Sequence, residues 1–456
     1  MRTLAVLGLW LVPSLASANG AFTHVHISQL AADGLGPGAL QTLLASPTNR
    51  AALEAGSMFP DSGYAIDDPY GELAHWEPFL GALIAQLRAT YGGDLSSPDA
   101  QRAVAFALGV ASHGMADQSY DTTLLDRAFE VDGPEDSTRP VDQYADYFLV
   151  VDHGVALDVE PWGPYGELSA AMAAVGHDVT QSTLINGQGR MSAVLDVQGN
   201  PRIAGNLYWD AWAQYPFLGT FVYDLDAVGS VPWLGALIAD YWQVVLDRLD
   251  ARDDVDAQLV IRTLPEDGGV NRPVSLDETV AWGRPALWFG YGIERDQIRP
   301  LLSLSEAGGG AAVPFTVQTA YGGRDRNLVF LRPDAPLAYD TEYTIELAAG
   351  VETLDGRTTT EPFLFSFRTR CAPDRLAECP PLAPPLVTGE IPRRPERPDA
   401  GPGSDAGSGA LDAGTGGASG GCGCRVTRPA SPARGAAPFG AAVLGLFALR
   451  RRGSAT

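Results

Sequence analysis

The sequence lacks lysine, so each of its 31 basic residues is an arginine, against 55 aspartates and glutamates. The formal net charge of the 456 residues is −24. A field this negative repels a polyanion at long range, which disfavours extended nucleic-acid binding. We therefore expect no nucleic-acid partner, although the charge does not prevent attack on one phosphodiester at a metal site.

Cysteine is also scarce, with four in the whole chain. Cys371 and Cys379 bracket the short segment CAPDRLAEC, and we expect them to form a local disulfide. Cys422 and Cys424 belong to a separate C-terminal motif. No cysteine is left for a thiolate metal site, so any metal must be held by histidines and carboxylates.

Long apolar runs are missing from the C-terminal region. Residues 371–421 are rich in Pro, Gly, Ala, Ser and Asp, a composition that cannot bury enough surface to fold, so we expect a disordered linker there. Residues 422–456 hold the Cys motif, a short hydrophobic stretch of 14 residues at 436–449 and an Arg cluster. Fourteen residues are too few for a comfortable membrane span.

This arrangement resembles the tripartite sorting tails of myxobacterial surface proteins, which are processed and keep the protein at the cell envelope. A true C-terminal membrane anchor is the alternative. At the other end, residues 1–18 contain one Arg, an apolar run and Ala16-Ser17-Ala18. This pattern is typical of a cleaved secretory signal peptide, which makes Asn19 the new N-terminus. We expect an exported protein, anchored at the cell surface or outer envelope, or secreted.

The folded region divides into two parts by its periodicity. Residues 19–256 are long enough for one large domain and favour an all-α fold. The apolar residues recur at helical spacing in eight segments: Ile27–Leu35, Gly38–Leu44, Asn49–Ala55, Trp76–Tyr91, Arg102–Leu125, Gln143–Leu157, Tyr165–Val179 and Trp233–Leu249.

From residue 257 to 370 short β-branched and aromatic runs alternate with turn residues. The runs are Leu259–Arg262, Ala286–Phe289, Phe315–Val317, Asn327–Leu331, Tyr343–Leu347 and Phe363–Arg368. The segments Pro265–Gly269, Leu337–Tyr343 and Phe365–Thr369 resemble the bacterial Ig-like domains of surface-layer proteins, so we expect a β-sandwich that serves in spacing or adhesion.

The segment Arg102–Leu125 is the one around which we organise the chain. Its small and apolar residues predict a buried helix, and His113 and Asp117, four residues apart, lie on one face of it. An imidazole and a carboxylate are costly to bury unless a charged group lies between them. By itself this spacing is more typical of a hydrogen-bonded pair than of a metal site.

Further motifs favour a metal site over a hydrogen-bonded pair. All six histidines fall in the helical part, several among carboxylates. Asp61 follows GSMFP in an expected loop, and His75 begins an expected helix. The sequence carries, in order, the motifs THV at 23–25, FPD at 59–61, HWxPFL at 75–80 and AFxxGxxSHxxAD at 105–117. Together they resemble the zinc-dependent phospholipase C superfamily, most of all the catalytic domains of glycosylphosphatidylinositol (GPI)-specific phospholipases D. The fungal single-strand-specific nucleases share this core.

The resemblance implies a pair of Zn²⁺ ions. Asp61, His75 and His113 would hold one, and Asp117 would bridge it to a second that His24 also binds. In the family the amine and carbonyl of the mature N-terminal residue complete the second site, which is the place of Asn19. Neutral imidazoles and carboxylates suit zinc, and a bridged pair activates a water for attack on phosphorus.

A third site is where this sequence departs from the family. The family uses a His after the bridging Asp and then a His-x-x-x-Glu pair. Here Asp121 takes the first place, and Asp142 and Asp146 have the i, i+4 spacing. Three carboxylates favour a harder ion such as calcium or magnesium over zinc, with His153 as a substitute ligand.

The leading hypothesis is an exported, metal-dependent phosphodiesterase that hydrolyses phospholipid or GPI-like head groups at a membrane surface, through a zinc-activated water. Asp61 is the candidate for assisting proton transfer. A single-strand nuclease with the same metals and a non-catalytic surface adhesin braced by metal are the alternatives. The choice of scissile bond, the head group and the oligomeric state stay open.

Overall fold

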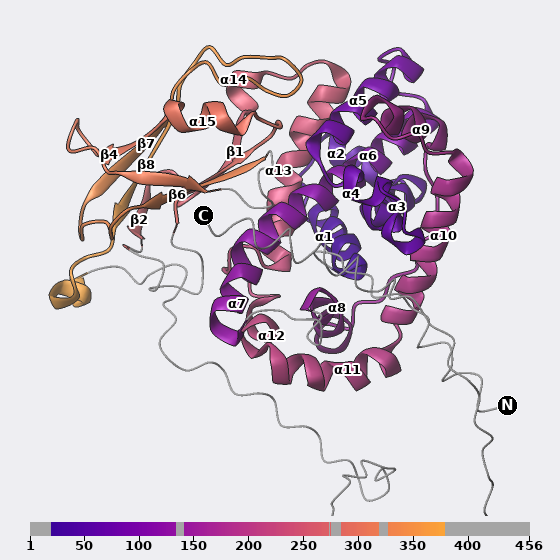
Figure 1. Cartoon of the computed structure of the whole chain (residues 1–456), viewed down its shortest axis with the longest axis horizontal. Coiled ribbons are helices and arrows are strands. Elements are labelled where there is room, and N and C mark those ends of the chain that lie inside the picture. The colour runs from indigo at the N-terminus through magenta and orange to yellow at the C-terminus, as the bar shows by residue number, and fades with distance from the viewer. Residues whose placement is uncertain (1–19, 134–140, 273, 275–283, 319–326, 379–456) are drawn as a thin grey trace, which may run out of the picture. The chain divides into compact units, whose positions relative to one another are not determined.

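The computed structural model describes residues 20–133, 141–272, 274, 284–318 and 327–378 of the 456 (Figure 1). The chain divides into two units, residues 1–393 and residues 394–456, and every described residue belongs to the first. The expected signal peptide, Asn19, Cys379 and the expected tail at 422–456 lie outside the described residues. Within the described part, no helix has both the length and the apolar character that a membrane crossing requires.

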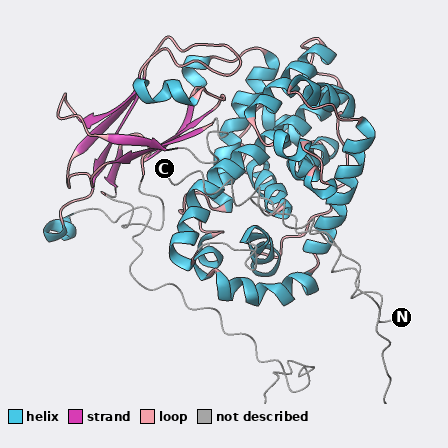
Figure 2. Ribbon diagram, viewed as in Figure 1, coloured by secondary structure: helices cyan, strands magenta, loops and turns pink. Residues whose placement is uncertain are grey.

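The first part of the unit is helical, as expected (Figure 2). Its helices are α1 (Ala21–Asp33), α2 (Ala39–Leu44), α3 (Pro47–Ser62), η2 (Tyr64–Ile66), α4 (Tyr70–Ala74), α5 (Glu77–Tyr91), α6 (Pro98–Tyr120), η3 (Asp121–Leu125), α7 (Asp126–Asp132), α8 (Val141–Asp152), α9 (Tyr165–Ala174), α10 (Gln181–Gln198), α11 (Pro201–Gln214), α12 (Pro216–Phe221), α13 (Val231–Asp250) and α14 (Val255–Gln258).

Each of the eight expected helical segments overlaps a helix. The local secondary structure at two site residues, however, differs from the prediction. Asp61 was expected in a loop and instead lies in the last turn of α3, which contains Pro60. The Gly and Pro that suggested a loop have other roles there: Gly56 allows a close helix contact, and Pro60 lies where the helix is about to end. His75 does not begin a helix, since it caps the C-terminus of α4 and α5 begins at Glu77.

The close packing of α3 on α6 sets the centre of the helical part. A Cβ added at Gly109 of α6 would lie 2.1 Å from the Leu53 carbonyl oxygen of α3, and one at Gly56 would lie 2.1 Å from the Phe106 carbonyl oxygen. Two glycines thus let the backbones of these helices touch. A third, Gly114, lets the carbonyl of His75 approach α6 in the same way, with 2.3 Å to an added Cβ.

The second part of the unit holds two four-stranded sheets, in the orders β1-β3-β6-β5 and β2-β8-β7-β4 (Figure 1). All pairings are antiparallel except that of β2 with β8. The elements are β1 (Val260–Leu264), β2 (Gly269–Arg272), β3 (Ala286–Phe289), α15 (Arg295–Leu301), β4 (Leu302–Glu306), β5 (Phe315–Gln318), β6 (Leu328–Pro333), β7 (Glu342–Leu347), β8 (Phe363–Thr369) and η6 (Pro373–Glu378). The Ig-like class of this β part stays a prediction.

The two central strands of the first sheet, β3 and β6, are buried on both of their faces. In β3, Ala286 and Trp288 join the core of the helical part, whereas Leu287 and Phe289 join the core between the sheets. β6 alternates in the same way between the two cores. A strand buried on both faces has a continuous apolar sequence, which is what ALWF shows. The β part is therefore packed against the helices through one face of β3 and β6.

Candidate metal centre

Four separate segments bring five of the predicted ligands together. His24 comes from α1, Asp61 from α3, His75 from the end of α4, and His113 and Asp117 from α6. All five are at most 5% exposed. They form two overlapping groups whose ligand atoms lie within 4.8 Å of one another: Asp61 with His75 and His113, and His24 with His113 and Asp117.

The separations in the first group match a tetrahedral zinc site. The Nε2 atoms of His75 and His113 are 3.0 Å apart, and they lie 3.5 and 3.7 Å from Asp61 Oδ1. Asp117 Oδ2 lies 3.3 Å from His75 Nε2 and 3.6 Å from His113 Nε2. Bonds of about 2.0–2.1 Å in a tetrahedron place ligand atoms about 3.3 Å apart. Asp61, His75 and His113 thus fit one ion, and Asp117 Oδ2 lies beside the two imidazoles of this group.

The hydrogen bonds of the two imidazoles fix which nitrogen faces this group. His113 Nδ1 lies 2.6 Å from the Ser57 carbonyl oxygen, and His75 Nδ1 lies 2.5 Å from that of Gly71. Because a carbonyl only accepts, each Nδ1 carries the proton, and each neutral ring points an Nε2 lone pair at the other. Two lone pairs 3.0 Å apart repel unless a proton or a cation lies between them.

Asp117 is placed to bridge two sites, because its oxygens face different histidines. Its Oδ1 lies 3.0 Å from His24 Nε2, while Oδ2 faces His75 and His113. The ring of His24 stacks on that of His113, with centroids 3.6 Å apart. Among the described residues, both carboxylate oxygens of Asp61 are buried without a hydrogen-bond partner, and so is His24 Nδ1. Buried polar atoms left this way fit a ligand set for a cation.

Burial and mutual charge set the protonation of this cluster. Burial, with the neighbouring His24, lowers the pKa of His113 to about 3, which keeps that ring neutral. Burial opposes ionisation of Asp117, but His24 and His113 outweigh it and hold its pKa below the ordinary range. For His75, burial acts to lower the pKa, but Asp61 and Asp117 outweigh it, so that the pKa lies above its ordinary value. Neutral imidazoles beside ionised carboxylates are the state that binds a divalent metal.

The predicted third-site residues are not gathered into a described group of ligands. Asp146 of α8 is fully buried, and its Oδ1 accepts hydrogen bonds from the backbone N–H and the hydroxyl of Thr23, at 2.9 and 2.7 Å. Burial raises its pKa to about 7. Asp121 is half-buried in η3, and the side chain of Asp142 lies outside the described residues. The third site therefore stays a prediction.

The remaining histidines are engaged elsewhere. His153, the substitute ligand for a third site, is exposed and stacks on Tyr223 with centroids 3.8 Å apart. His26 Nε2 lies 3.2 Å from the hydroxyl of the same Tyr223. His177 Nε2 lies 2.8 Å from Asp68 Oδ1. None of the three belongs to a metal-ligand group among the described residues.

Sequence reasoning missed the groups that orient the ligands. The backbone carbonyls of Ser57 and Gly71 have no residue-type signal, because any residue supplies a carbonyl. It also missed a small hollow that Asp61 helps to line, since the residues around this hollow come from five elements. They are Ala21, Asp61, Tyr64, Gln143, Met191, Val194 and Gln198.

Comparison with known proteins identifies the segment that carries the cluster. A family model described as zinc dependent phospholipase C matches residues 23–120. The phosphatidylinositol-glycan-specific phospholipase D of Rattus norvegicus is 32% identical over 124 residues, which cover 25% of this chain and 15% of that protein. The Bos taurus protein of the same name is 30% identical over 122 residues, covering 25% and 14%. The chain thus spans a small fraction of these relatives.

Among solved structures, the match to surface layer protein SbsC, domains 1-6, covers 78% of this chain and 45% of that chain. The sequence identity is 12% and the TM-score is 0.18. A TM-score this low carries no argument about the fold. The segment 23–120 contains all five clustered ligands. That part of the chain therefore matches the zinc-dependent phospholipase C family.

Proposed function

We propose that this protein is a zinc-dependent phosphodiesterase that hydrolyses the head-group phosphodiester of a phospholipid or glycophospholipid. The observation that carries the proposal is the pair of imidazole Nε2 atoms 3.0 Å apart, with both Nδ1 atoms held by backbone carbonyls and the Asp61 and Asp117 carboxylates beside them. The match to zinc dependent phospholipase C supports the reaction class. The names of the mammalian relatives support the lipid class of substrate.

The residues divide between two proposed ions. Asp61, His75 and His113 would hold the first, Asp117 would bridge, and His24 would serve the second. Such ions polarise a phosphoryl oxygen and supply a nucleophile at neutral pH. The second site as proposed also needs the N-terminal amine and carbonyl of Asn19, which follows only if the chain is cut after Ala18.

The chain's own residues prepare the site in three ways. The carbonyls of Ser57 and Gly71 hold the two imidazoles in one tautomer and orientation, so no reorganisation is needed when charge develops. Asp117 stays ionised because its neighbours favour its charged form. Asp61 lines the hollow, and neither of its oxygens has a hydrogen-bond partner in the described part of the chain, which makes it the candidate acceptor for a proton.

The test is a product assay on purified protein with choline-type and inositol-type phosphodiester lipids, read by mass spectrometry. We expect hydrolysis by wild type, loss on treatment with a strong chelator and recovery on adding zinc. His113→Asn should be inactive. His177→Asn is the matched control, because it breaks a histidine–aspartate pair outside the metal groups and should retain activity. Turnover that survives both chelation and His113→Asn would refute the proposal.

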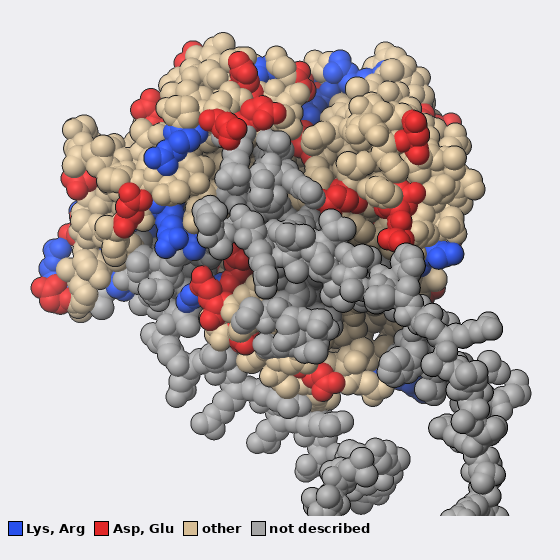
Figure 3. All heavy atoms as spheres, viewed as in Figure 1, with Lys and Arg blue, Asp and Glu red and all other residues tan. Residues whose placement is uncertain are grey.

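Assays on the same purified protein test the two alternative functions. Digestion of single-stranded DNA but not of lipid would indicate a nuclease, although acidic side chains are spread over both parts on the face drawn in Figure 3 and do not suit a polyanion. Metal that raises the melting temperature with no turnover of any phosphodiester would indicate a braced adhesin. Export to the cell surface is part of our proposal and is tested by locating the mature protein.

A further inference from the structure

The β part contacts the helical part directly beside two of the proposed metal ligands. Asn327, just before β6, is 2% exposed. Its backbone N–H donates to Gln118 Oε1 at 3.2 Å, and Gln118 follows the bridging Asp117 in α6. Its side-chain Nδ2 donates to Glu77 Oε2 at 3.4 Å, and Glu77 is the first residue of α5, two after His75. One β-part residue thus ties together the two ligand-bearing segments.

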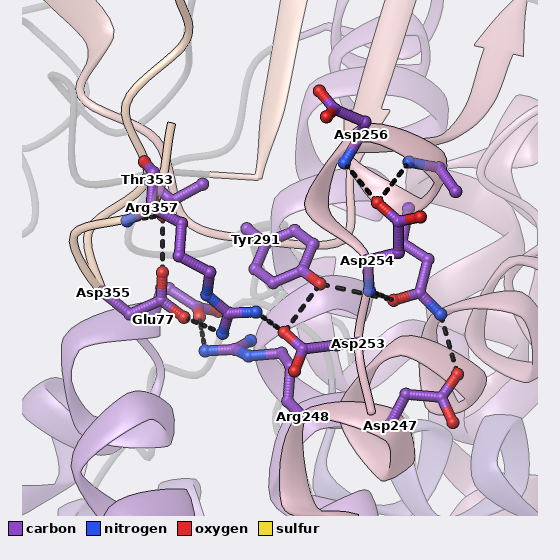
Figure 4. Close-up of polar contacts among 12 residues, drawn as sticks. Glu77, Asp247, Arg248, Asp253, Asp254, Asp256, Tyr291, Thr353, Asp355 and Arg357 are labelled. Carbon is purple, nitrogen blue, oxygen red and sulfur yellow. Dashed lines mark hydrogen bonds and ion pairs between the residues drawn. The ribbon is translucent and has the colours of Figure 1, made fainter. Parts of the chain in front are cut away.

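Glu77 is itself anchored by a buried ion pair. Its Oε1 lies 2.7 Å from Arg248 of α13, with both side chains 3% exposed, and its Oε2 accepts from the Tyr241 hydroxyl at 3.1 Å. Figure 4 shows Glu77 and Arg248 at the junction with Tyr291 of the β part. A carboxylate this buried is costly to shift, so the start of α5 is held firmly. Among the described residues of the β part, Asn327 hydrogen-bonds to this anchor.

A second contact lies at the next residue of α6, Ser119. Trp288 of β3 donates from Nε1 to the Ser119 hydroxyl at 2.9 Å, and its ring lies in the helical core. Asn327 Nδ2 also donates to the Phe289 carbonyl at 3.2 Å, which ties it to the same strand. One end of the β3–β6 strand pair therefore braces α6 at Gln118 and Ser119, immediately after the bridging carboxylate.

Small shifts here reach the ligands because the backbones are in contact. The carbonyl of His75 packs against Gly114 of α6. His75 and Asp117 can therefore keep their relative position only while the start of α5 and the last turn of α6 stay together. A zinc site tolerates errors of about 0.2 Å in its ligand distances. Groups that orient metal ligands typically contribute about 10–100-fold in metal affinity.

We infer that the β part is a built-in positioning element of the metal centre, and that Asn327 is its positioning residue. The inference rests on the metal sites of the proposed function but not on the substrate. It differs from the spacing or adhesion role that the sequence suggested. It also predicts that the helical part does not form a fully competent metal site without the sheet that covers α6.

The experiment compares zinc affinity and folding stability in full-length variants. Asn327→Ala removes the hydrogen bonds to Glu77 and Phe289 while leaving the backbone N–H in place. Tyr291→Phe is the matched control, because it removes part-buried hydrogen bonds to Asp253 and Gln258 at the same junction, away from the ligands. Zinc affinity is measured by competition with a chromogenic chelator. Denaturation of the metal-free proteins measures stability, and turnover is recorded as a separate readout.

We expect Asn327→Ala to bind zinc about 10–100-fold more weakly than wild type, and Tyr291→Phe to bind it as wild type does, at comparable stability of the metal-free forms. Gln118→Ala is a second variant that removes the other contact from within α6, should Asn327→Ala fail to fold. It should weaken zinc binding in the same direction.

Wild-type zinc affinity in the Asn327 or Gln118 variant would overturn the inference, as would equal weakening in Tyr291→Phe. A wild-type protein that binds no zinc would overturn it as well. If zinc binding is weakened in Asn327→Ala but not in Tyr291→Phe, and no phosphodiester is turned over, this inference stands and the proposed function is refuted.

Discussion

The contact between α3 and α6 yields the sharpest prediction, because backbone atoms cannot rotate out of the way. In Gly109→Ala the new methyl group would lie 2.1 Å from the Leu53 carbonyl oxygen and 2.6 Å from the Ser57 backbone nitrogen. Ordinary van der Waals contact begins at 3.4 Å, so the helices must separate by about 1.3 Å. His113 lies one turn further along α6 and Asp61 one turn beyond Ser57 in α3.

That separation would dismantle the first metal group. The His113–Asp61 distance of 3.7 Å would grow to about 5 Å, beyond the roughly 3.3 Å that a tetrahedral site needs. The hydrogen bond from His113 to Ser57 would lengthen as well. Overpacking typically costs about 1–3 kcal/mol, and the better helix propensity of alanine returns at most about 1 kcal/mol. We therefore expect a less stable protein with strongly weakened zinc binding.

Chemical denaturation of the metal-free protein and zinc competition measure the two effects. Gly189→Ala is the control, since a Cβ at this position of α10 meets nothing within 4 Å. It should gain about 0.5–1 kcal/mol and keep its zinc affinity. If Gly109→Ala matched Gly189→Ala in stability and zinc content, the proposed role of the helix contact would be wrong.

Four shorter predictions concern the same centre. Asp117→Asn should lose both ions in elemental analysis of the purified protein, since this carboxylate faces both groups. In the metal-free protein, the low pKa of His113 leaves stability unaffected above about pH 6.5 but lowers it as the pH falls toward about 3, because the unfolded chain then binds a proton that the folded protein does not. The unfolding free energy of His113→Asn should therefore fall less steeply on acidification than that of wild type, by about 1.4 kcal/mol per pH unit. Glu77→Gln leaves Arg248 buried without its counter-charge and should cost about 3–5 kcal/mol in denaturant unfolding. Mass spectrometry of the mature protein should find Asn19 at its N-terminus.

Local patterns in the sequence predicted many of the elements but missed others, among them α10, α11 and β4. The runs Ala286–Phe289 and Phe363–Arg368 correspond to β3 and β8. In contrast α10 was missed because it is polar and glycine-containing along much of its length, and it packs only a few residues inward. Such a helix is stabilised by its neighbours more than by its own pattern, so single-sequence periodicity does not reveal it.

The candidate site shows the same division. Residue types and short spacings, such as His113 and Asp117 four apart on one helix, followed from the sequence, because helical geometry alone places them on one face. Three features did not follow from the sequence: the Ser57 carbonyl that orients His113, the helical position of Asp61, and the contact of Asn327 with α6 next to Asp117.

What the amino-acid sequence determined by itself is the chemistry of the ligands and the period of each segment, since both are properties of nearby residues. Only the tertiary structure decided the 3.0 Å approach of His75 and His113 and the burial of β3 on two faces. These depend on backbones far apart in the chain, which meet where glycines such as Gly109 and Gly114 leave room for them.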